Sequence, residues 1–125
     1  MCRGAAATTA LLLLACSDPL GPFQPQITNV PDNFQLQATG LNNVTTTVQY
    51  TWQNSGTTAN VNQATVTTAG TATLIIKHAA GTQVYTKDLN ANGTFVTSAG
   101  TSGAWTIRLE LVSVSGTLNF RVQKP

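Results

Sequence analysis

The sequence predicts an all-β fold, an antiparallel two-sheet β-sandwich of seven to eight strands with Ig-like, Greek-key connections. Thr is conspicuously abundant, and its β-branched side chain favours strands. Only 8% of the residues are charged, against about 25% in ordinary globular proteins. From residue 34 onward, apolar and polar residues alternate with period two between turn residues, and no segment shows a helical period. Strands with one buried face and one solvent-exposed face are typical of antiparallel sheets.

Residues 1–15 have the features of a secretory signal peptide. Arg3 gives the start a positive charge, and residues 5–15 form an uncharged, largely apolar run. A basic start, an apolar core of about 7–15 residues and a final small residue are typical of such signals. The run is shorter than the about 20 residues that span a bilayer. We therefore expect residues 1–15 to be removed on export.

The signal ends in Leu13-Leu14-Ala15-Cys16, and this ending resembles the lipobox of bacterial lipoproteins. The resemblance implies that the Cys16 sulfur receives a diacylglyceryl group, that cleavage follows Ala15, and that the new amine is acylated. Two or three acyl chains anchor a protein stably. The alternative is ordinary secretion with Cys16 as an unpaired thiol, since Cys2 leaves with the signal.

Residues 16–31 are expected to form a Pro-rich tether that follows the lipidated Cys16. Proline fixes φ and pushes the preceding residue towards extended conformations. Four of the five prolines lie here: Pro19, Pro22, Pro25 and Pro31. At about 3.1 Å per residue, such a tether holds the domain roughly 40 Å from the membrane. Residues 27–30 of this segment have an alternative interpretation, in which they pair with the domain as an edge strand. The β-sandwich domain is expected over residues 32–125.

The alternating runs of the domain predict its strands in order. They are Phe34–Leu41, Val44–Asn54, Asn60–Thr68 (a weakly patterned edge), Ala72–His78, Thr82–Leu89, Thr94–Ser98, Ala104–Val112 and Thr117–Gln123. Two connections suggest a register. A hairpin loop at residues 79–81 sets Ile76 opposite Val84. A loop at residues 113–116 sets Leu111 opposite Leu118.

The last two runs contain Gly103-Ala104-Trp105-Thr106-Ile107 and Gly116-Thr117-Leu118-Asn119-Phe120. They resemble small β-sandwich modules of bacterial exported proteins, such as those of the pre-peptidase C-terminal type. The resemblance implies the sandwich fold, and no functional residue is carried over from it.

The titratable residues give no catalytic pattern, so we expect a non-enzymatic protein without metal or cofactor. His78 is the sole histidine, which excludes a site of several histidines and a triad with a spare base. The mature acids are scattered, with no calcium-loop spacing. A glycosidase needs two facing carboxylates, which Asp88 and Glu110 supply only by coincidence of folding. The cations form no cluster, which argues against nucleic-acid binding.

Aromatic residues are the natural candidates for ligand binding, because aromatic faces stack on sugar rings. Trp52 and Trp105 fall on the apolar phase of their strands, which favours core packing. Tyr85 is out of phase with Val84 and is expected to be exposed. Trp52 and Tyr85 are kept as the candidate ligand-binding residues, and Trp105 is expected in the core.

These observations predict a lipid-anchored protein of the bacterial envelope, with a non-catalytic sandwich that serves as a binding or structural module. Its expected partners are the membrane, through the anchor on Cys16, and an envelope protein or glycan. The alternative is a carbohydrate-binding module that uses exposed aromatics, and a small hydrolase is the third hypothesis. By analogy with lipoprotein sorting, Ser17 in place of an aspartate after the cysteine indicates the outer membrane.

Overall fold

The computed structural model describes Leu20 and residues 25–125, and these form an antiparallel β-sandwich without helices. Its strands join in one seven-stranded sheet. They are β1 (Gln26–Val30), β2 (Asn33–Asn54), β3 (Asn60–Gln63), β4 (Val66–Lys77), β5 (Gln83–Asp88), β6 (Gly93–Val96) and β7 (Gly103–Gln123). The predicted all-β class and the number of strands are confirmed.

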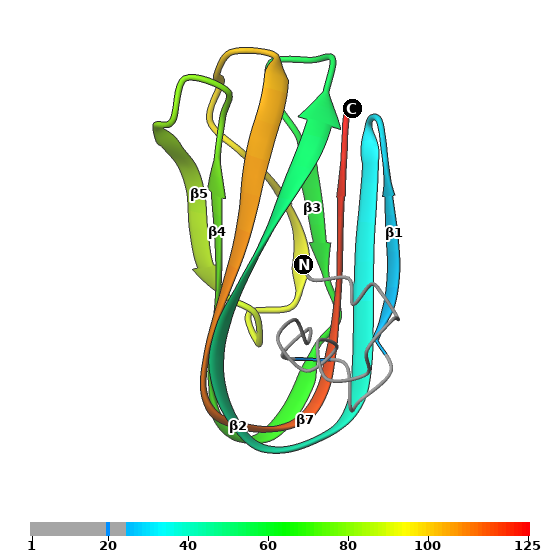
Figure 1. The fold of residues 1–125 in the computed structure, drawn as a ribbon, viewed down its shortest axis with the longest axis vertical. Coiled ribbons are helices and arrows are strands. Elements are labelled where there is room, and N and C mark those ends of the chain that lie inside the picture. The colour runs from blue at the N-terminus through cyan, green and yellow to red at the C-terminus, as the bar shows by residue number, and fades with distance from the viewer. Residues whose placement is uncertain (1–19, 21–24) are drawn as a thin grey trace, which may run out of the picture.

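The sheet is folded over on itself, so that β2 and β7 run through both layers of the sandwich (Figure 1). Layer 1 contains β1, residues 33–38 of β2, residues 117–123 of β7, β3 and β6. Layer 2 contains residues 46–54 of β2, residues 103–112 of β7, residues 71–77 of β4 and β5. The two layers of the predicted sandwich are therefore parts of one continuous sheet.

The strands bend together at one end of the sandwich, here called the bend end. The β2–β7 register shifts three times between Ala38 and Thr46, and the β4–β7 register shifts near Gly70. Backbone with positive φ occurs at Gly40, Asn43, Gly70, Ser113 and Gly116, all within these stretches. Extra residues and left-handed conformations in a ladder increase its local bend and twist. The opposite end, where the β1–β2 turn lies, is called the loop end.

The predicted turn at residues 113–116 is one of these bends and not a hairpin loop. Leu111 consequently lies opposite Thr46 and Ala72 instead of Leu118. Residues 39–43 likewise bend one long strand, where two separate strands were expected. Both expectations were wrong because a bulge uses the same Gly, Asn and Ser residues as a turn.

The middle of the chain differs from the prediction in two further places. The expected edge strand at residues 60–68 is divided into β3 and the start of β4, and β3 lies between β6 and β7. The β4–β5 hairpin sets Ile76 opposite Tyr85 and Lys77 opposite Gln83. Val84 is therefore bulged, and the predicted register is wrong by one residue.

The N-terminal part of the described chain belongs to the folded domain. Residues 27–30, left open between tether and edge strand, lie in β1, which pairs with the start of β2. Leu20 is fully buried within the core cluster. The domain thus includes residues before position 32. The predicted signal peptide and Cys16 lie outside the described residues.

Candidate functional site

Trp52 lies in the core and not on a binding surface. Its side chain has no exposed area, and its Nε1 donates a hydrogen bond to the Val30 carbonyl oxygen at 3.1 Å. Its ring meets Trp105 edge to face, with centroids 6.0 Å apart at 88°. Trp105 is equally buried, as predicted, and its Nε1 donates to the Thr101 carbonyl oxygen. Neither indole offers a face to a sugar ring.

The exposure predicted for Tyr85 is wrong. Because Val84 is bulged, the consecutive side chains of Val84 and Tyr85 are both buried. The Tyr85 hydroxyl donates to Gln63 Oε1 at 2.6 Å, and burial raises the pKa of Tyr85 to about 12. The candidate ligand-binding pair Trp52 and Tyr85 therefore has no surface available in this fold.

Gln63 is a buried polar residue that the sequence analysis missed. Its Nε2 is close enough to donate to the carbonyl oxygens of Asp88, Leu89 and Ala91, at 3.0 to 3.3 Å. It thus ties β3 to the loop after β5, and its oxygen accepts from Tyr85. Its burial could have been predicted from its position two residues after Val61, because residues two apart in a strand point to the same face.

His78 is hydrogen-bonded to nearby backbone. Its Nδ1 accepts from the backbone N–H groups of Ala80 and Thr101, both at 3.1 Å. Asp88 lies opposite Thr73, several residues along the hairpin from His78. In the part of the chain that the structure describes, no three His, Cys, Asp or Glu residues are grouped closely enough to hold a metal.

A shallow pocket of about 340 Å³ opens at the loop end, between the β1–β2 turn and the ends of β2 and β7. Its acid is Asp32, whose two oxygens accept from Ser55 N at 2.7 Å and Ser55 Oγ at 2.9 Å. These hydrogen bonds hold the pKa of the Asp32 carboxyl below its usual value. Asp32 also donates its N–H to the Gln53 carbonyl oxygen. The carboxylate therefore fastens the turn to β2 and is not a free base.

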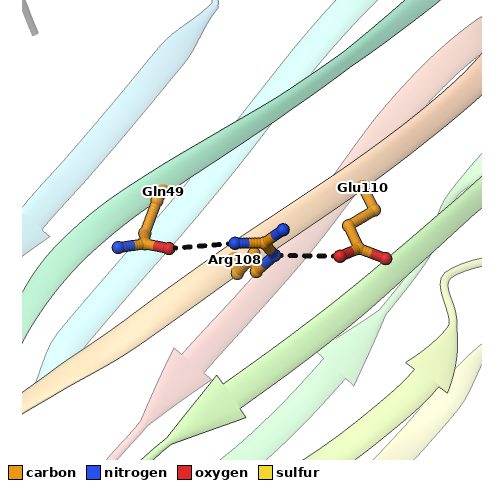
Figure 2. Close-up of polar contacts among 3 residues, drawn as sticks. All are labelled: Gln49, Arg108 and Glu110. Atoms are coloured by element: carbon orange, nitrogen blue, oxygen red, sulfur yellow. Dashed lines mark hydrogen bonds and ion pairs between the residues drawn. The ribbon is translucent and has the colours of Figure 1, made fainter.

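The outward face of layer 2 carries charges of both signs. Arg108 Nε pairs with Glu110 Oε2 at 2.9 Å, and its Nη1 donates to Gln49 Oε1 at 3.4 Å, as Figure 2 shows. Both side chains are more than a third exposed, so the pair contributes about 0–1 kcal/mol. The register adds Lys77 and Asp88 to the same layer.

The outward face of layer 1 is different, because amides dominate it; we call it the amide face. Side chains alternate between the faces of a strand, so the neighbours of buried Phe34, Phe120 and Val61 point outward. The register aligns them across the strands in three rows: Val30, Asn33, Gln123, Asn60 and Val96; Thr28, Gln35, Arg121, Asn62 and Thr94; Gln26, Gln37 and Asn119. All are at least partly exposed.

The amide face extends over the neighbouring strands β1, β2, β7, β3 and β6, and it includes two exposed valines, Val30 and Val96. Within it Arg121 Nη2 donates to Gln35 Oε1 at 3.4 Å, and Thr94 Oγ1 donates to Asn62 Oδ1 at 2.7 Å. Each side-chain amide has two N–H donors and an accepting oxygen, so the amides of this face can hydrogen-bond to a ligand. The alternation in the sequence identifies these residues as the polar face of their strands, but only the strand register shows that they lie side by side.

No protein-family model and no curated protein matches the chain. Among solved structures, it is similar to a chain in the crystal structure of accessory secretory protein 1, 2 and 3 of Streptococcus pneumoniae. The TM-score is 0.39 and the identity 10%, over 82% of this chain and 87% of that one. Among the described residues, no helix is long and apolar enough to cross a bilayer.

Proposed function

We propose that this chain is a lipid-anchored protein of the bacterial envelope, with a sandwich that acts as a non-catalytic binding module. The anchor is proposed from the lipobox-like ending at Cys16 and the signal-like residues before it. The binding role is supported by one observation above all, the broad amide face of layer 1. The buried positions of Trp52 and Tyr85 leave no support for binding through these two aromatics.

Strand β1, the first described strand after the proposed anchor, begins at the bend end of the sandwich. Gln26 pairs with Gln37 beside the bends, whereas Val30 pairs with Asn33 at the loop end. Leu20 is already buried in the core. At about 3.6 Å per residue, the four residues from Cys16 to Leu20 reach at most about 14 Å. The proposed arrangement therefore holds the sandwich near the bilayer, and not at the roughly 40 Å of a free tether.

The lipid anchor is tested by metabolic labelling with a fatty-acid analogue. We expect the wild type to be labelled and Cys16→Ala to be unlabelled and unprocessed. Cys2→Ala is the matched control and keeps its label, because Cys2 leaves with the signal. An unlabelled wild type, or a Cys16→Ala variant that still carries label, would contradict the anchor. Fractionation of the labelled protein then tests the outer-membrane assignment, which retention in the inner membrane would overturn.

A further inference from the structure

We infer that the amide face binds a neutral, polyhydroxylated glycan, with the chain laid flat across the strands of layer 1. The inference rests on the proposed binding function and names the ligand class of that surface. The residues at its centre are Gln35, Asn62, Gln123 and Asn119, from β2, β3 and β7. None of them belongs to the aromatic pair that the sequence suggested.

The first argument is the hydrogen-bonding chemistry of the side chains. A primary amide offers two N–H donors and an accepting oxygen, so each Asn or Gln can both donate to and accept from a sugar hydroxyl or acetamido group. The rows place such groups about 4.8 Å apart between strands and about 7 Å apart along a strand. These spacings are close to the dimensions of a pyranose ring, so successive sugars can each meet an amide.

The second argument is charge. Arg121 is the sole charged residue in the three rows of the amide face, and the rows contain no acid. Layer 2 instead carries Arg108, Glu110, Lys77 and Asp88 on its strands. One cation gives little attraction for a polyanion, whose binding depends on several neutralised charges. An uncharged ligand matches this surface better than nucleic acid, an acidic polysaccharide or a charged protein patch.

The third argument concerns strength. The rows of the amide face contain no aromatic residue, and each net hydrogen bond contributes only about 1 kcal/mol. A single domain therefore binds a glycan weakly. Many copies anchored in one membrane engage one polymer together, and linked sites raise the apparent affinity by about 10²–10⁴-fold. Lipid anchoring and a weak, extended binding face therefore suit each other.

The experiment uses the processed, lipidated protein reconstituted in phosphatidylcholine vesicles that contain a fluorescent lipid. The vesicles are passed over chitin beads and cross-linked dextran beads, which are neutral, and over carboxymethyl-dextran beads, which are anionic. The variants are Gln35→Ala/Asn62→Ala/Gln123→Ala on the amide face, and Thr47→Ala/Gln49→Ala/Thr73→Ala on layer 2 as the matched control. Circular dichroism and urea midpoints confirm that both variants fold like the wild type.

We expect vesicle retention on at least one neutral bead, a loss of at least about tenfold in the amide-face variant, and a change within about twofold in the control. No retention on either neutral bead, equal losses in both triple variants, or retention on the anionic bead alone would overturn the inference. Failure of the anchor is detected separately, because unanchored protein does not float with the vesicles in a density gradient. Such protein is applied directly to the same beads, and its binding is judged by the same criteria.

Discussion

At the residue scale, the core near the loop end contains two indoles that pack edge to face. Trp52 and Trp105 are register partners in layer 2, both fully buried, and each Nε1–H has a backbone acceptor. The Trp52 hydrogen bond reaches Val30 in layer 1, so this side chain also joins the two layers. A buried Trp with its N–H satisfied combines a large apolar area with a fixed orientation.

We predict that Trp52→Ala and Trp105→Ala each lower the free energy of unfolding by about 3–5 kcal/mol. A smaller effect at Trp52 would follow from its place near the strand end, but its burial and its bond to Val30 argue for equal importance. Urea unfolding of the full chain, followed by circular dichroism, gives the values. Val112→Ala, at a side chain that is 56% exposed, is the control and should change stability by less than about 0.5 kcal/mol. A Trp52→Ala loss below about 1 kcal/mol would contradict the packing described.

The sequence predicts burial well where alternation is unbroken, as at Trp105. It fails at Tyr85, because a single bulged residue, Val84, reverses the phase of the strand beyond it. Gln63 was missed for a different reason. A buried amide is recognisable only when its partners are known, and these come from Tyr85 and the loop after β5, far away in sequence.

At the element scale, the main feature is that β2 and β7 bend and continue where a hairpin was expected. Near the bends, Asn43 N donates to Ser115 Oγ and Ser113 N donates to Thr45 Oγ1. Side-chain hydroxyls thus satisfy backbone groups that the shifted register leaves without a ladder partner. The strand positions were predictable from alternation, but hairpin and bend were not distinguishable, since both use Gly, Asn and Ser at positive φ.

Gly116→Ala tests the bend directly. Gly116 has φ +128°, and a Cβ there would collide with the Val66 carbonyl oxygen and come within 2.8 Å of Thr67 Cα. We expect a loss of at least about 2 kcal/mol in unfolding free energy, because backbone on the neighbouring strand must move.

Gly81→Ala is the matched control for that variant. Gly81 also has positive φ, +90°, but a Cβ there meets nothing within 4 Å. Its loss should be about 1 kcal/mol, from backbone strain alone. Urea unfolding of both variants gives the comparison. Equal losses would show that β4 and β7 do not pack closely at residue 116.

At the scale of the whole molecule, the folded-over sheet makes the two layers depend on each other. The strands shared by both layers are β2 and β7, and the core cluster includes side chains from both. The shared core and the shared strands hold the layers together. The amide face is rigid only if layer 1 is held by layer 2 in this way. The outward residues of this face were visible in the sequence as a polar phase, but their alignment depends on long-range pairings that no local pattern specifies.

The most direct test of this account is urea unfolding of the full chain followed in each layer separately. Tryptophan fluorescence reports layer 2, which holds both indoles, and fluorine-labelled phenylalanine reports layer 1 through the resonances of Phe34 and Phe120. We expect the two probes to give the same midpoint and the same dependence on urea, as a single two-state transition requires. Separate transitions, with layer 1 unfolding before layer 2, would contradict a single sheet that runs through both layers.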